Sequence, residues 1–261
     1  MDTLAIAHRR LALHCQGRYS GRPRANDQEY QTELLENPDD PSTIQAMQMV
    51  LHLPKQQPPP RADVLAASAQ AVVAVCLAPQ AGHDGAWAQA LERWYTHRIR
   101  KVARRARGSA WHKVHVLPGV SVESGQAQVR AFVPSAVAEV PAQIAKLQIH
   151  GTDVPYEPVA QPPAEDLPVI YVDRSLGMTM GKTAAQVGHG AMLLAAELSY
   201  AHILQWQHNN FACTVREVDA QQFRLACDQA PVRVQDAGFT EIAPGSVTVC
   251  AAPRPLTLSQ C

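Results

Sequence analysis

Three side chains suited to ester or phosphate chemistry lie close together in the last third of the chain. They are Lys182, Gln186 and His189, and their three- and four-residue spacing would place them on one face of a helix. Gly181 precedes them, and the free amides at a helix N-terminus attract anions. The segment therefore predicts a group that holds a phosphate or polarises an ester carbonyl. In the alternative, Lys182 begins a solvated face and His189 makes a hydrogen bond in the core.

A second set of polar side chains follows farther along the chain. Asp236 comes directly after a short strand-like segment, and Thr240 and Thr248 lie beyond it. α/β proteins commonly gather their chemistry at strand ends. Asp236 could orient or deprotonate a water, and a threonine hydroxyl could donate to a developing oxyanion. The alternative is that Asp236 caps a turn and the threonines fill β positions.

In this order, the two segments resemble the signature blocks of the second, archaeal- and eukaryotic-type family of peptidyl-tRNA hydrolases. The resemblance covers residues 167–253 and rests on Gly181-Lys182-Thr183-Ala184-Ala185-Gln186-Val187-Gly188-His189, Trp206 and Asp236-Ala237-Gly238-Phe239-Thr240-Glu241-Ile242-Ala243-Pro244-Gly245. It implies hydrolysis of the ester that joins a peptide to tRNA. The catalytic or binding groups that it implies are Lys182, Asp236, Thr240 and Thr248. Gln186 and His189, which share the helix face of Lys182, are expected to contact the substrate.

Three positions depart from the family pattern. Met180 stands where members usually carry a second lysine, Phe239 where they carry a basic residue, and Glu241 where they carry glutamine. Two positive groups that would meet an RNA backbone are therefore missing. A lysine restored at position 180 is expected to strengthen RNA binding. A non-catalytic relative that binds RNA or protein is the alternative function.

A basic segment in the first half offers a replacement for that charge. Between Glu92 and Glu123 there is no acidic residue, and we expect a helix over residues 86–107 that presents a row of basic side chains. The expected phosphate contacts are Arg98, Arg100, Lys101, Arg104, Arg105 and Arg107. The alternative is an ordinary solvated helix face.

Composition narrows the class of protein. Lys and Arg total 23 against 23 for Asp and Glu, so no global field indicates a nucleic-acid partner. The six cysteines form no CxxC pair, and His and Cys lack metal-ligand spacing, so we expect reduced thiols, a cytoplasmic protein and no metal or organic cofactor. The partner implied is tRNA, as peptidyl-tRNA; no membrane association is expected, and a homodimer is open.

The elements predict an α/β fold with a C-terminal three-layer α/β domain around a small mixed sheet, since strands over 169–172, 211–218, 232–234 and 247–251 alternate with helices over 182–198 and 220–229. A smaller α+β domain and a disordered N-terminal tail precede it. The expected ranges are a flexible tail at 1–60, the α+β domain at 61–152, a proline-rich linker at 153–166 and the hydrolase-like domain at 167–255.

The segment from Asp63 to Leu77 has two interpretations. Apolar residues at helical spacing favour an amphipathic helix, whereas the run of β-branched residues over 72–77 favours a buried strand. A β-hairpin is expected over 113–133. With a strand at 72–77 the first half would resemble the second, and a diverged internal duplication is then an alternative. Met47 and Met49 leave open a later translation start.

Overall fold

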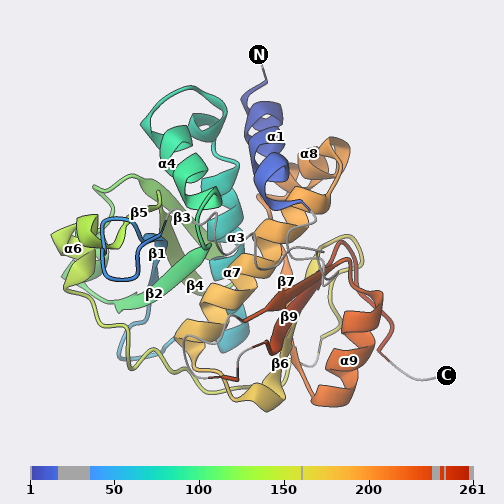
Figure 1. Ribbon diagram of the computed structural model, residues 1–261. Helices are drawn as coiled ribbons and strands as arrows, with labels where there is room; N and C mark the ends of the chain where they lie inside the picture. Colours follow the sequence, from blue (N-terminus) through green and yellow to red (C-terminus); the bar gives the residue numbers. More distant parts are fainter. Residues whose placement is uncertain (1, 17–35, 160, 237–241, 244, 259–261) are drawn as a thin grey trace.

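The computed structural model describes residues 2–16, 36–159, 161–236, 242–243 and 245–258. Two β-sheets stand on either side of a layer of helices, with α3 and α7 at its centre (Figure 1). Further helices cover the outer faces: α5 and α6 on the N-terminal sheet, and α9 on the C-terminal sheet. The α/β class predicted from the sequence is confirmed.

The C-terminal half begins at strand β6 and ends at strand β9. Its sheet has the strand order β7-β6-β9-β8, in which β6 and β7 are parallel and the other pairs antiparallel. The elements are β6 (Val169–Asp173), α7 (Met180–Glu197), α8 (Tyr200–His208), β7 (Thr214–Val218), α9 (Ala220–Gln229), β8 (Val232–Gln235) and β9 (Val247–Ala252). The strands and the two long helices expected here are confirmed, and α8 was not expected.

The N-terminal half contains α1 (Thr3–Cys15), β1 (Gln45–His52), α3 (Arg61–Cys76), α4 (Ala86–Tyr95), β2 (Arg100–Ala106), α5 (Ser109–Lys113), β3 (Gly119–Ser124), β4 (Ala127–Phe132), β5 (Ser135–Ala136) and α6 (Ala142–Ala145). Its sheet has the order β2-β1-β4-β3, with β5 added beside β1. The β3–β4 hairpin is confirmed. The helical interpretation of residues 63–77 is correct, because α3 covers them as far as Cys76.

The two halves repeat one topology. The order β1, α3, α4, β2, α5, β3, β4 matches β6, α7, α8, β7, α9, β8, β9. The pairings match as well: the first strand of each half is parallel to the second and antiparallel to the last, and the last two strands are antiparallel. The first half therefore resembles the second even though residues 72–77 are helical, because β1 supplies the strand.

Two expectations for the N-terminal half are wrong. Residues 1–60 are not a flexible tail throughout, since α1 packs against α7 and β1 is a central strand of its sheet; residues 17–35 lie outside the described part of the chain. Met47 and Met49 are fully buried in β1. The helix expected over 86–107 ends at Tyr95, and residues 100–106 form strand β2 instead.

One continuous core joins the halves. Leu51 and Val129 of the N-terminal sheet, Val72 of α3 and Ile170 and Val249 of the C-terminal sheet belong to a single cluster of buried side chains. Two glycines let α7 approach its neighbours on both sides, because a Cβ on Gly188 would meet Val72 and one on Gly190 would meet Val249. The segment Arg61–Gly82 is long and apolar enough to cross a membrane, but 78% of its most apolar window is buried inside the protein.

The proline-rich segment between the halves is bound to the protein surface. Among its described residues no helix or strand forms from 151 to 168, in keeping with an extended linker. Val154 is buried, and Arg216 of β7 donates to the carbonyl oxygens of Val159 (3.0 Å) and Gln161. Arg174 lies over the ring of Tyr156, 4.7 Å from its centroid. The segment is therefore held in place along much of its length.

Candidate active site

Four side chains, from α7, from β9 and from the residue that follows β8, form one hydrogen-bonded network. The ammonium of Lys182 pairs with Oδ2 of Asp236, and the amide of Gln186 donates to the same oxygen at 2.7 Å. The hydroxyl of Thr248 donates to Oε1 of Gln186 at 3.0 Å. Residues one turn apart on α7 thus meet the carboxyl end of β8 at one edge of the sheet.

The network is almost closed to solvent. The side chain of Lys182 is 13% exposed and that of Asp236 is 7% exposed, while Thr248 is fully buried. Asp236 is fixed by its backbone as well: its amide donates to the carbonyl of Ser246 at 2.9 Å, and its carbonyl accepts from the amide of Gly245 at 2.8 Å. A partly desolvated ion pair interacts more strongly than one in water, so any group that reaches it meets a strong local field.

Thr248 lies beside Lys182 and Asp236, as expected, and its hydroxyl is engaged within the protein. Its hydroxyl points to Gln186 and to the carbonyl of Val234 (3.3 Å), and no part of the side chain is exposed. In this position the hydroxyl holds the side chain of Gln186. Thr240, together with Phe239 and Glu241, lies outside the described residues.

The N-terminus of α7 is already capped. The hydroxyl of Thr179 accepts from the amide of Lys182 at 3.3 Å, and the carboxylate of Asp153 accepts from the amide of Met180 at 3.4 Å. Two amides that were expected to attract an anion therefore have partners within the protein. His189 lies farther along α7 and is half-buried.

The position of Met180 contradicts the expectation that a lysine there would strengthen RNA binding. Its side chain is fully buried and belongs to the core shared by the two halves. A lysine at this position would point into that core and not towards RNA. Met180 therefore does not occupy a surface position of the site from which a positive charge is missing.

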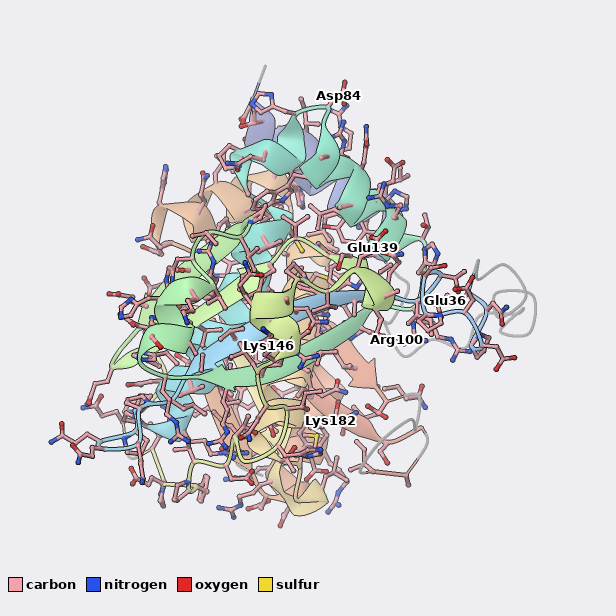
Figure 2. All side chains as sticks on the ribbon, turned by 90° about the vertical axis from the view of Figure 1, so that its left-hand side faces the viewer. Glu36, Asp84, Arg100, Glu139, Lys146 and Lys182 are labelled. Atoms are coloured by element: carbon pink, nitrogen blue, oxygen red, sulfur yellow. The ribbon has the colours of Figure 1, made fainter. Side chains whose placement is uncertain are left out.

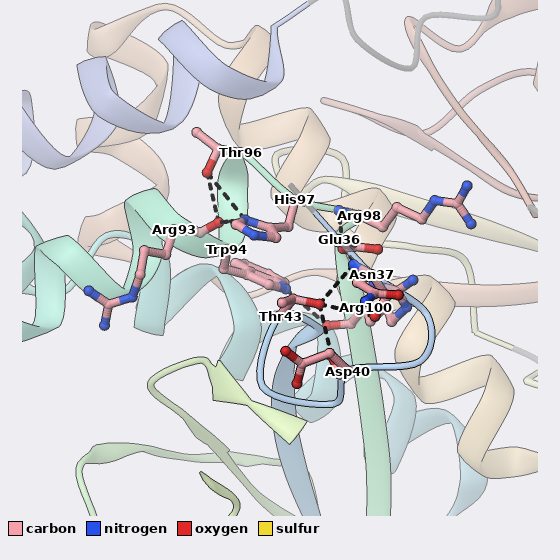
Figure 3. A network of polar contacts seen from close by, with 10 residues as sticks. All are labelled: Glu36, Asn37, Asp40, Thr43, Arg93, Trp94, Thr96, His97, Arg98 and Arg100. Atoms are coloured by element: carbon pink, nitrogen blue, oxygen red, sulfur yellow. Dashed lines mark hydrogen bonds and ion pairs between the residues drawn. The ribbon is translucent and has the colours of Figure 1, made fainter. Parts of the chain in front are cut away.

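The basic residues expected on a helix lie instead in and beside strand β2. Figure 2 shows Arg100 beside Glu36 and both of them away from Lys182. Nη1 of Arg100 and the backbone amide of Arg98 both donate to Oε1 of Glu36, at 2.7 and 2.8 Å, as Figure 3 shows. Glu36 is itself 6% exposed, so these contacts hold the chain before β1 against the edge strand.

The rest of the basic row is also largely engaged. Arg104 donates to Gln48 (3.0 Å) and to the carbonyl of Leu147 (2.9 Å), and burial lowers the pKa of its guanidinium. Arg105 bonds Gln148. The ammonium nitrogen of Lys101 is enclosed 4.9 Å from the centre of the Trp94 ring, and burial lowers its pKa to about 7. Of the six expected phosphate contacts, only Arg107 is exposed, and the other five are half-buried.

A comparison with known families identifies the part of the chain that carries the network. Residues 168–258 match the family model "Peptidyl-tRNA hydrolase PTH2". The resemblance drawn from the sequence is thereby confirmed for this part of the chain. The PTH2 match begins just before β6 and ends after β9, so Lys182, Gln186, Asp236 and Thr248 all fall inside it. No solved structure matches the chain.

Sequence reasoning missed two residues that contact the first turn of α7 from outside the network. Arg61, the first residue of α3, reaches Thr183 next to Lys182, and Asp153 holds the first amide of α7. Arg61 is a lone basic residue after three prolines, which gives no sign of burial. Within the described ranges, no group of three His, Cys, Asp or Glu side chains could hold a metal ion.

Proposed function

We propose that the protein hydrolyses the ester bond of peptidyl-tRNA, releasing peptide and free tRNA. The observation that carries the proposal is the network of Lys182, Asp236 and Gln186 at the carboxyl end of the sheet, inside the segment that matches the PTH2 family. An ester linked to tRNA is the substrate class that the family name indicates.

The network offers two of the functions that ester hydrolysis needs. The carboxylate of Asp236 orients and accepts a proton from a water that attacks the ester carbonyl. The ammonium of Lys182 stabilises the negative charge that develops on the carbonyl oxygen. Gln186, held by Thr248, fixes the orientation of the carboxylate so that both functions act at one place.

A single-turnover assay on a model peptidyl-tRNA tests the proposal. Asp236→Asn keeps the volume of the side chain and removes its charge, so cleavage should fall by about 100-fold or more while tRNA affinity stays within about twofold. Asp173→Asn is the matched control, because Asp173 ends β6 at the same sheet edge and, among the described residues, its side chain bonds only Ser175. Unchanged cleavage by Asp236→Asn, or equal loss of binding and turnover, would reject the catalytic role.

A non-catalytic relative that binds RNA or protein is the second candidate. Its protein-binding form is favoured by the internal bonds of Arg100, Arg104 and Arg105, which leave little basic surface for a large polyanion. The same assay separates the two functions. Absence of cleavage by the wild-type chain would support the second candidate, and tRNA affinity would then separate its RNA-binding form from its protein-binding form.

A further inference from the structure

We infer that Arg61, from the N-terminal half, is a positioning residue for Lys182 in the C-terminal half. The inference rests on the proposed function. Arg61 begins α3, whereas Lys182 lies in the first turn of α7, and the two helices pack side by side at the centre of the molecule (Figure 1). The N-terminal half would then act as a built-in partner that completes the site.

A chain of hydrogen bonds leads from Arg61 to the backbone of Lys182. Nη2 of Arg61 donates to the hydroxyl of Thr183 at 3.3 Å, and that hydroxyl donates to the carbonyl of Thr179 at 2.8 Å. The hydroxyl of Thr179 in turn accepts from the amide of Lys182. Movement of the guanidinium would therefore disturb the cap that sets the first turn of α7.

Arg61 is itself held by a fork of contacts. Its Nε and Nη2 donate to the two carboxylate oxygens of Glu217, at 2.8 and 2.9 Å, and its Nη1 donates to the carbonyl of Val154 at 3.3 Å. The two side chains of the pair are 10% and 9% exposed. Bidentate pairing of an arginine fixes orientation as well as position, which an ammonium group would not do.

The N-terminal half shows no matching network of its own among the described residues. Asp63 holds the third position of α3, as Lys182 does in α7, and its carboxylate accepts from the amide of Gln126 at 2.9 Å. Gly125 turns the β3–β4 hairpin directly above Asp63, where the second half has a longer connection between β8 and β9. The N-terminal half thus contributes to the site of Lys182 and Asp236 in the C-terminal half.

The test compares full-length variants in three measurements: thermal stability, single-turnover cleavage of peptidyl-tRNA with its substrate dependence, and acetylation of the Lys182 amine followed by mass spectrometry. Arg61→Met alone leaves Glu217 without its partner. Arg61→Met with Glu217→Met removes both charges and should recover most of the stability. Thr183→Val leaves the ion pair in place and removes the hydroxyl through which Arg61 reaches the carbonyl of Thr179. Val129→Ala, a buried change in the N-terminal sheet, is the control for stability loss alone.

The double variant and Thr183→Val should lower the cleavage rate at saturating substrate about 10- to 100-fold, with KM little changed, and should raise acetylation of Lys182 several-fold. Val129→Ala should melt earlier and cleave normally. Recovery of cleavage together with stability in the double variant would make Arg61 merely structural, as would normal cleavage by Thr183→Val. If the wild-type chain cleaves nothing, the proposed function fails, and Lys182 acetylation still decides the inference: equal labelling in all folded variants overturns it.

Discussion

Gly188 of α7 lies directly against Val72 of α3, where a Cβ built on the glycine would come 2.7 Å from Cγ2 of the valine. Val72 is fully buried and β-branched, so it has little freedom to move aside. Gly188→Ala gains about 1 kcal/mol of helix propensity but overpacks this contact by about 1–3 kcal/mol, and we expect a net loss in urea unfolding. Adding Val72→Ala should relieve the overpacking. If Gly188→Ala is stabilising on its own, the helices are less tightly packed than the structure indicates.

Met180→Lys should destabilise the protein and not strengthen RNA binding. The change places an ammonium in a fully buried position of the shared core, at a cost of about 4 kcal/mol or more, and the variant should unfold at much lower urea concentration. Met180→Leu, the control, should cost less than about 1.5 kcal/mol. Normal stability with tighter tRNA binding would show that position 180 faces the substrate after all.

Lys101→Met should raise the free energy of unfolding by about 1–3 kcal/mol at pH 7. Burial lowers the pKa of Lys101 to about 7 in the folded protein. Between pH 7 and the ordinary pKa of a lysine side chain, the unfolded chain therefore binds a proton that the folded chain does not. Wild-type stability should therefore rise with pH across this window, and the rise from this group should vanish in the variant. Lys146→Met, at an exposed lysine, is the control. Identical pH profiles for wild type and Lys101→Met would contradict the prediction.

Arg104→Gln should affect stability, whereas Arg107→Gln with Lys113→Gln should affect RNA binding. Arg104 joins β2 to the carbonyl of Leu147 and to Gln48, so its loss should cost about 1–3 kcal/mol. Arg107 and Lys113 are exposed, and removing both charges should flatten the salt dependence of tRNA affinity by about one to two units in the log-log slope. An unchanged slope would exclude this face from RNA binding.

Thr248→Val should slow cleavage several-fold without changing KM. The variant keeps the shape of the side chain but leaves Oε1 of Gln186 without this donor, so the amide that holds Asp236 loses its fixed orientation. Single-turnover rates measure the effect. Thr214→Val in β7 is the control. A loss of 100-fold or more would instead indicate that the hydroxyl acts on the substrate.

The C-terminal half could be predicted from the sequence because its signals agree with one another. Apolar periodicity predicted α7 and α9, and the motif order gave the neighbours of Lys182 and Asp236. Strand β1 was missed because it is central in its sheet and buried on both faces, so Gln45 to His52 shows no alternation of polar and apolar residues. Because β1 pairs with both β2 and β4, the N-terminal sheet could not be predicted without it.

The basic row misled the prediction for a related reason. Arg98, Lys101 and Arg105 recur at helical spacing, yet Lys101 and Arg105 also share one face of a strand, and periodicity over so short a segment allows both. Pairing with β1 decides the outcome in favour of the strand. The contacts of Arg61 could not be predicted from the sequence either. Its buried partner Glu217 lies more than a hundred residues away along the chain, so the pair leaves no local pattern.

The single core that runs through α3 and α7 makes the two halves one cooperative unit. Since the buried side chains of both sheets pack against the same pair of helices, neither half can open without exposing the apolar face of the other. A substitution that loosens the N-terminal sheet therefore lowers the free energy that keeps Lys182 and Asp236 together, however far it lies from them. Selection for an intact site in the C-terminal half therefore also acts on the core residues of the N-terminal half, which contains no such network among its described residues.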